Sequence, residues 1–342
     1  MTITTIHIGA DVEDTYLKNE QEWMCRIVDA AHKFDTVVIV MVEGAALEEL
    51  NFKGKKFLQI LKELCDSNQW DQTKFKFQLP NLTQNPAVWP AIEIQQITAH
   101  FLAIQNTSYS LDKSIEKTFG MFVGRSSWDR LLLASYLLQH HQNITKQTYR
   151  NYLDNPASMI GLDLDRLCWQ VSSAGKLDTI LIHRVINLIS SLPLLLSDTH
   201  KDITHLQWDG GAVDAEIIGW YNNIFVDIVC EKMITGQTFF PTEKTARPLA
   251  TGTPFLIMGA PNHIKNLRRL GFRSFGQFWD ESYDHQQGVQ RVESIQRITD
   301  DLAKLDHEQL KDMYQQMRPV LEHNYNVYKA LTGEKICSVF KI

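Results

Sequence analysis

Residues 35–42 read DTVVIVMV, an almost unbroken apolar and β-branched run of strand length. Such a run is typical of a strand that is buried on both faces of a parallel sheet. Around it the sequence pattern predicts a strand at 3–9, a helix at 17–33, a helix at 54–65, a strand at 74–79 and a helix at 91–102. Strands that alternate with helices indicate βαβ units. The first part of the chain is therefore predicted to be an α/β domain with a parallel sheet.

A polar, turn-rich segment at 106–112, NTSYSLD, predicts a linker between domains. After it the alternation resumes, with strands expected at 117–123, 224–231 and 254–259, and helices at 128–140, 242–251, 262–270, 287–303 and 307–331. Gly271 follows one of these helices, where a left-handed residue commonly ends a helix. We predict two α/β domains, residues 1–112 and residues 113–342.

The charge of the chain is unevenly distributed. Its formal net charge is −6, and all of that excess lies in residues 1–112, because the remainder holds equal numbers of acidic and basic residues. A protein that holds nucleic acid through its phosphates usually has a basic face. The overall charge gives no support for such a function, and it leaves a local basic groove open.

The five cysteines are far apart and form no CxxC pair, so neither a zinc site nor a disulfide framework is indicated. The sequence starts with no basic segment followed by an apolar one, and it has no apolar run long enough to span a membrane. We therefore expect a reducing, cytoplasmic setting.

The most informative stretch for function is residues 239–259, FFPTEKTARPLATGTPFLIMG. Thr242 is a good N-cap for a short helix, and a helix N-terminus with unbonded N–H groups attracts phosphate. Lys244 and Arg247 add positive charge at the same end, and Glu243 could accept hydrogen bonds from ribose hydroxyls. A charged, capped surface helix without a ligand is the competing interpretation.

Several motifs in and around this stretch occur together: Thr242-Glu243-Lys244, Pro248-Leu249-Ala250, Gly252 and Pro254-Phe255. A strand ending at Glu231 precedes them, and Leu270-Gly271-Phe272 and the run FWDESYD at 278–284 follow. This combination resembles the donor-binding segment of α1,3-fucosyltransferase-type glycosyltransferases, and it is similar to phage and microbial glycosyltransferase-like proteins. The resemblance covers 224–284. It extends more weakly to 117–133 through Gly124-Arg125 and Arg130, and it does not reach the first 110 residues.

The resemblance implies a GT-B fold, in which two Rossmann-like domains face a cleft and the C-terminal helices pack across. Residues 113–342 would hold the nucleotide-diphosphate sugar, a UDP- or GDP-sugar, and residues 1–112 would meet the acceptor. Glu243 would then contact the ribose and Lys244 the diphosphate, with Arg125 after Gly124 as a second diphosphate partner. Thr242 and Arg247 complete the expected donor set. Enzymes of this fold commonly stabilise the leaving group with basic side chains and a helix dipole instead of a metal, so no metal is expected.

An inverting transfer needs a general base, which would come from the N-terminal domain. Asp11 and Glu43 each follow a predicted strand and are our candidates, although an acid in such a place is more often a solvated loop residue. Asp163-Leu164-Asp165 has the spacing of a D-x-D metal motif, but we interpret it as an acid in a loop or at a helix start.

The acceptor stays open at this point. The similarity to phage-type proteins suggests a hydroxymethylated base in DNA, whereas the acidic first domain argues against DNA. A glycan acceptor, a sugar-nucleotide epimerase and a non-catalytic binding protein that keeps the fold are the alternatives.

Overall fold

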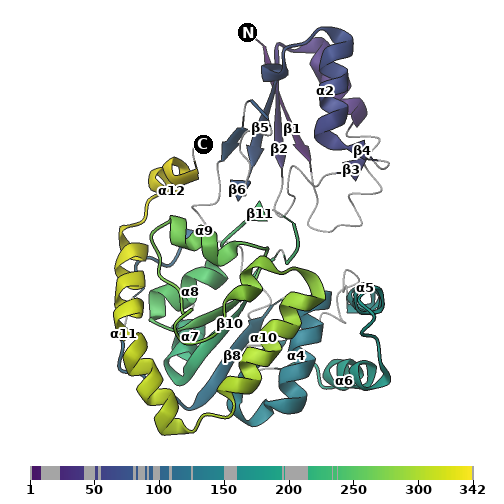
Figure 1. Cartoon of the computed structure of the whole chain (residues 1–342). Helices are drawn as coiled ribbons and strands as arrows, with labels where there is room; N and C mark the ends of the chain where they lie inside the picture. The colour runs from purple at the N-terminus through teal and green to yellow at the C-terminus, as the bar shows by residue number, and fades with distance from the viewer. Residues whose placement is uncertain are drawn as a thin grey trace. The chain divides into compact units, whose positions relative to one another are not determined.

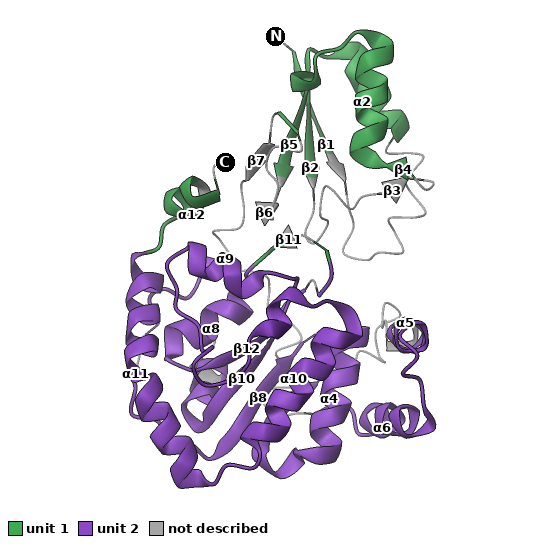
Figure 2. Ribbon diagram, viewed as in Figure 1, with its two compact units in different colours: residues 1–100, 236–240, 331–342 green, residues 101–235, 241–330 purple. Residues whose placement is uncertain are grey.

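The computed structural model of the chain describes residues 2–8, 24–41, 51–52, 55–79, 82–83, 89–90, 92–94, 101–107, 110–124, 126–149, 160–194, 196, 215–232, 234–236 and 238–340. The chain divides into two compact units (Figure 2). Unit 1 contains residues 1–100, 236–240 and 331–342, and unit 2 contains residues 101–235 and 241–330. The last residues thus return to unit 1. The domain boundary at 112/113 remains a prediction.

Unit 1 is built on a four-stranded parallel sheet in the order β1-β2-β5-β7. These strands are β1 (Ile3–Ile8), β2 (Thr36–Met41), β5 (Phe75–Leu79) and β7 (Ile92–Ile94). The other elements of the unit are a helix at 24–33, β3 (Asn51–Phe52), β4 (Lys55–Lys56), α2 (Phe57–Asn68), η2 (Gln72–Lys74), β6 (Leu82–Thr83), β11 (Thr238–Phe239) and α12 (Gly333–Phe340).

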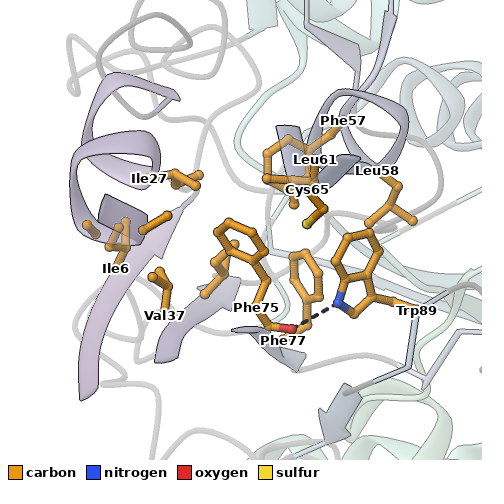
Figure 3. Packing of buried hydrophobic residues seen from close by; sticks show 13 residues of the cluster. Ile6, Ile27, Val37, Phe57, Leu58, Leu61, Cys65, Phe75, Phe77 and Trp89 are labelled. Carbon is orange, nitrogen blue, oxygen red and sulfur yellow. Dashed lines mark hydrogen bonds between the residues drawn. The ribbon is translucent and has the colours of Figure 1, made fainter. Parts of the chain in front are cut away.

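The core of unit 1 lies between one face of this sheet and two helices (Figure 3). The register places Ile6 opposite Ile39 and Ile39 opposite Phe77, and all three side chains are buried. Phe57 and Leu61 of α2 pack into the same cluster. The intervening Val38 and Val40 are only half-buried, so in the described residues β2 has one fully buried face and not the two that its composition suggested.

Unit 2 contains a second four-stranded sheet, in the order β12-β10-β8-β9, and every neighbouring pair in it is parallel. Its strands are β8 (Lys117–Val123), β9 (Thr145–Tyr149), β10 (Ile224–Cys230) and β12 (Phe255–Met258). Its helices are α4 (Trp128–His140), η4 (Gln142–Ile144), α5 (Ile160–Ser173), α6 (Thr179–Ser190), α7 (Ala215–Trp220), η7 (Tyr221–Asn223), α8 (Glu243–Thr251), α9 (His263–Arg269), η8 (Ser282–His285), α10 (Gly288–Leu302) and α11 (His307–Ala330).

Helices cover both faces of the sheet of unit 2. α4 contacts α5, α6 and α10, while α8 contacts α11 (Figure 1). Every residue of β10 is buried, as expected for a central strand between two helical layers. Gly120 on β8 permits close packing, because a Cβ there would lie 2.4 Å from Cδ1 of Ile224 on β10.

The structure corrects some of the expected elements. The helix predicted at 91–102 is wrong in part, because Ile92–Ile94 forms the edge strand β7. The helix predicted to start at residue 54 starts at Phe57, after the short strand β4. β9 was not predicted at all. The expected helix at 128–140 and the expected strand at 117–123 are confirmed to the residue. Within the described part of the chain, no helix is both long and apolar enough to cross a membrane.

Candidate functional site

The sheet of unit 2 has a topological switch point between β8 and β10. From β8 the chain passes through α4 to β9 on one side, and from β10 it passes through α8 to β12 on the other. Because parallel crossovers are right-handed, the two helices lie on opposite faces and their N-termini separate. Gly120 stands opposite Asp227, and both strands end three residues later, so their carboxyl ends are level. Ligands of open α/β sheets bind in the crevice at such a point.

The residues that follow β10 build one side of this switch point. Thr242 is the N-cap of α8, as predicted, and its side-chain oxygen accepts a hydrogen bond from the N–H of Lys244 at 3.3 Å. Glu231 lies directly after β10 and is 1% exposed. Its Oε1 accepts hydrogen bonds from the N–H of Thr242 (2.9 Å), from the N–H of Thr245 (3.3 Å) and from Oγ1 of Thr245 (2.6 Å). Its Oε2 accepts one from Oγ1 of Thr242 at 2.7 Å.

This arrangement corrects one expectation from the sequence. The N–H groups of Lys244 and Thr245 already donate to acceptors within the protein, so they are not free to bind a phosphate. The buried carboxylate of Glu231 takes the place that an anion would occupy at the N-terminus of α8. The positive charge available for a ligand at this end of the helix therefore comes from side chains.

Glu243 and Lys244 form the first turn of α8 and an ion pair, with Nζ of Lys244 2.8 Å from Oε1 of Glu243. Their side chains are 23% and 27% exposed, so both are accessible at the carboxyl edge of the sheet. Burial alone would raise the pKa of the Glu243 carboxyl, but the cations of Lys244 and Arg247 outweigh it and hold that pKa at about 2. Glu243 is thus a carboxylate acceptor at any ordinary pH.

Arg247 lies one turn further along α8 and is 9% exposed. It hydrogen-bonds Tyr221, and its charge acts on Asp227 and on Glu243. The side chain is thus part of the interior of unit 2 as well as a neighbour of the Glu243 carboxylate. Sequence reasoning placed Arg247 in the donor set and did not foresee these buried partners.

A buried polar cluster continues from Arg247 beneath α8. Nζ of Lys113 donates to the carbonyl oxygen of Tyr221 at 2.9 Å and also to Oγ1 of Thr253. Burial lowers the pKa of Lys113 to about 7 and raises the pKa of Asp227 to about 7. The cluster supports α8 from below, because Thr253 lies directly after the helix and also contacts Thr251 on it.

The residues that follow β8 build the other side of the switch point. Gly124 is exposed, and a Cβ placed on it would meet nothing within 4 Å, so a ligand can approach the backbone there. Arg130 on α4 is buried and reaches across to β10, where its Nη2 donates to the carbonyl oxygens of Cys230 (2.9 Å) and Glu231 (3.0 Å). It thereby ties the start of α4 to the end of β10.

Three candidate residues lie outside the described part of the chain. These are Asp11 and Glu43, the candidate general bases, and Arg125, the candidate second diphosphate partner. The sequence places Asp11 and Glu43 shortly after β1 and β2, and Arg125 directly after Gly124.

The D-x-D triplet lies at the start of a helix, one of the two places expected for it, since Asp163 is in the first turn of α5. Residues i and i+2 of a helix point in different directions, so Asp163 and Asp165 do not converge on one ion. Among the described residues, no group of three or more His, Cys, Asp or Glu is placed to hold a metal ion.

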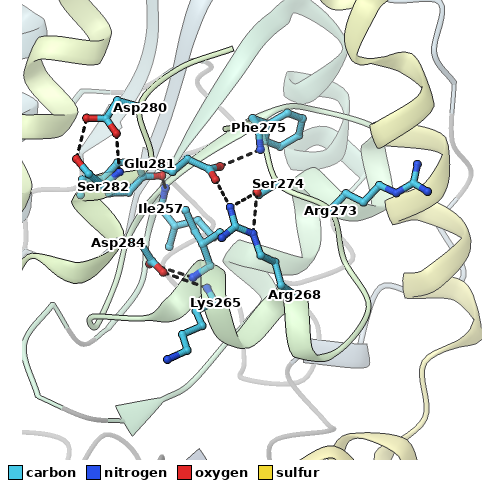
Figure 4. A network of polar contacts seen from close by, with 12 residues as sticks. Ile257, Lys265, Arg268, Arg273, Ser274, Phe275, Asp280, Glu281, Ser282 and Asp284 are labelled. Atoms are coloured by element: carbon cyan, nitrogen blue, oxygen red, sulfur yellow. Dashed lines mark hydrogen bonds and ion pairs between the residues drawn. The ribbon is translucent and has the colours of Figure 1, made fainter. Parts of the chain in front are cut away.

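Acidic side chains of the run at 278–284 bind the backbone at the start of α9 and after its end (Figure 4). Asp284 accepts hydrogen bonds from the N–H groups of Ile264 and Lys265 at the start of α9, each at 3.0 Å. Arg291, which is fully buried, pairs with Asp284 and donates to the carbonyl oxygens of Ile257, Tyr283 and Asp284. Glu281 accepts from the N–H of Phe275 at 2.8 Å. This motif therefore positions α9 against β12.

No protein-family profile matches the chain, and no curated protein matches it. A solved structure entitled the DNA modifying enzyme beta-glucosyltransferase, in the presence and absence of the substrate uridine diphosphoglucose, aligns over 100% of both chains with a TM-score of 0.38 and 8% identity. Similarity at this level does not define a shared fold.

Proposed function

We propose that this chain is a glycosyltransferase of the GT-B type, which moves a sugar from a nucleotide-diphosphate donor to an acceptor hydroxyl. One observation carries the proposal: the Thr242-Glu243-Lys244 turn of α8 lies at the switch point of an all-parallel sheet, level with Gly124 across it. A carboxylate, a cation and an open glycine at the carboxyl edge suit a ribose followed by a diphosphate.

The proposed roles follow from the chemistry of each group. Glu243, ionised at ordinary pH, would accept hydrogen bonds from the ribose hydroxyls, and Lys244 would pair with the diphosphate. As the glycosidic bond breaks, negative charge builds on the diphosphate, and Lys244 with Arg125 would stabilise that charge. Arg247 would act through Glu243 by its charge. Either Asp11 or Glu43 would take the proton of the acceptor hydroxyl.

For the acceptor we propose a hydroxymethylated base in DNA, which would have to leave the base stack to reach the site. The support for this choice is the resemblance of the motifs in residues 224–284 to those of phage-type proteins. A glycan acceptor is the alternative within the same reaction class.

Ligand-dependent thermal unfolding of the full chain tests the donor site. UDP, GDP, CDP and their sugars are each compared with inorganic pyrophosphate. A ligand at about 100 times its Kd stabilises the folded protein by about 2.7 kcal/mol. We expect one nucleotide to raise the melting temperature, and we expect Lys244→Ala to abolish the shift.

Variants separate the two proposed contacts. Glu243→Gln should weaken the nucleotide and leave pyrophosphate unchanged, whereas Lys244→Ala should weaken both. Lys311→Ala is the matched control, since Lys311 is a second helical lysine of unit 2 that pairs with a nearby acid, Glu308. The proposal fails if no nucleotide changes the melting temperature, or if the control variant responds as Lys244→Ala does.

Transfer itself is tested with an oligonucleotide that contains hydroxymethylcytosine and with the nucleotide sugar that binds. The expected product gains one hexose or pentose in mass. Asp11→Asn or Glu43→Gln should abolish this gain while the donor still raises the melting temperature. Release of free sugar or an altered donor, with no gain in acceptor mass, would point to a hydrolase or an epimerase.

A further inference from the structure

Positive charge is concentrated in one segment of this acidic chain. Residues 244–279 contain Lys244, Arg247, Lys265, Arg268, Arg269 and Arg273, and they contain no Asp or Glu. The last four of these are all exposed. They lie on α9 and in the turn that follows it, and we call them the α9 basic surface.

Two of these cations form no ion pair with any residue that the structure describes. Within the described residues, neither Nζ of Lys265 nor the guanidinium of Arg273 belongs to an ion pair, and Figure 4 shows both side chains directed away from the polar network. Arg268, by contrast, pairs with Glu281 and donates to Oγ of Ser274. Both cations are exposed and have no ion-pair partner among the described residues, so they are available to attract an anionic partner.

The backbone beneath the surface is held firmly. Asp284 caps the start of α9 through the N–H groups of Ile264 and Lys265. Asn324 of α11 bonds both backbone groups of Arg273, accepting from its N–H at 2.7 Å and donating to its carbonyl oxygen at 2.9 Å. The cations therefore project from a fixed scaffold, and truncating their side chains removes none of these backbone contacts.

The composition of the surface distinguishes between kinds of polyanion. The apolar side chains of this segment, including Leu267, Leu270 and Phe272, are buried inside unit 2. Binding in a membrane interface needs an apolar face that can insert, and this surface presents none. Arginines bind phosphate in a bidentate manner, and a DNA duplex carries one charge per about 1.7 Å of its axis.

We propose that the α9 basic surface binds the phosphate backbone of duplex DNA. The choice of DNA among phosphate polymers rests on the acceptor proposed above. α9 begins shortly after β12, at the same edge of the sheet as the first turn of α8, so the α9 basic surface starts with Lys265 at the edge that holds the proposed donor site.

The test is binding of a fluorescein-labelled, unmodified DNA duplex to the full chain, without any nucleotide sugar, measured by anisotropy at several salt concentrations. Each phosphate contact contributes about 0.9 to the slope of log K against log salt. The double variant Lys265→Ala/Arg273→Ala should therefore lower the slope by about 2. Between 50 and 200 mM salt, wild-type protein should lose about tenfold more affinity than this variant does.

Lys304→Ala/Lys311→Ala is the matched control, because it removes the same charge from lysines that pair with neighbouring acids elsewhere in unit 2. It should leave the slope unchanged. Equal slopes for both double variants would overturn the proposal, and so would equal or tighter binding of an RNA duplex or of anionic vesicles through the same residues. The nucleotide-dependent melting shift should be the same in Lys265→Ala/Arg273→Ala as in wild type. Failure of the donor site and failure of the DNA surface are therefore read from separate measurements.

Discussion

Replacing Glu231 tests the account of α8 most directly. Its carboxylate is buried and accepts four hydrogen bonds from Thr242 and Thr245, which tie the start of α8 to the end of β10. In Glu231→Ala, two N–H groups and two hydroxyls of Thr242 and Thr245 lose their acceptor. An unsatisfied buried group costs about 1 kcal/mol or more, so the variant should lose about 4 kcal/mol of stability.

Glu231→Gln should lose much less. The amide oxygen can take the position of Oε1 and keep the bonds from both N–H groups and from Oγ1 of Thr245. The amide nitrogen then faces Oγ1 of Thr242, which can accept from it. The negative charge at the helix N-terminus is lost, and the hydroxyl proton of Thr242 loses its acceptor, for about 1–2 kcal/mol in all.

Thermal and urea unfolding, followed by circular dichroism, measure the total loss of stability. Hydrogen exchange of the peptide 238–251 shows whether that loss is confined to the start of α8. Glu308→Ala, which removes a carboxylate that is 78% exposed, is the control and should change stability by less than about 0.5 kcal/mol. Equal losses in Glu231→Gln and Glu231→Ala, or unchanged exchange of α8 amides in Glu231→Ala, would refute the reasoning.

Three further predictions follow from other parts of unit 2. Burial raises the pKa of Asp227 from 3.8 to about 7, so wild-type protein should lose stability as the pH rises from about 4 to 7, because only the unfolded chain releases this proton. Over that pH range Asp227→Asn should lose up to about 4 kcal/mol less stability than wild-type protein, measured by urea unfolding at each pH. Stability curves that run parallel for the two proteins would contradict this. Gly271 has φ 99° and only an ordinary contact with Val327, so Gly271→Ala should cost about 1–2 kcal/mol in urea unfolding through backbone strain alone. Tyr314→Phe removes a 2.9 Å hydrogen bond to the carbonyl oxygen of Gly252 and should lower stability by about 1 kcal/mol in the same assay, while a change at the noise level would show that water replaces it.

The basic surface could have been found from the sequence. Counting acids as well as cations along the chain reveals the acid-free run from 244 to 279. The net charge of residues 113–342 taken together is zero, and this sum hides the run. What the count cannot supply is exposure: of the six cations, Arg247 on α8 is 9% exposed and counts as buried, whereas Lys265 on α9 is exposed to solvent.

Elements with strong local signals were predictable from the sequence by itself. The apolar run of β10, the N-cap at Thr242 and the left-handed Gly271 each depend on a few neighbouring residues, so local chemistry determines them. β7 was mistaken for a helix because a strand of three residues is too short to show a period of two, and it forms by pairing with β5.

Only the tertiary structure decided what surrounds the start of α8. The strand order that creates the switch point depends on pairing between β8 and β10, which are about a hundred residues apart. The same pairing brings Glu231 under Thr242 and Thr245, so an internal carboxylate occupies the helix N-terminus that the sequence suggested was open. A sequence motif shows which groups are available, whereas long-range packing determines which of them already have partners.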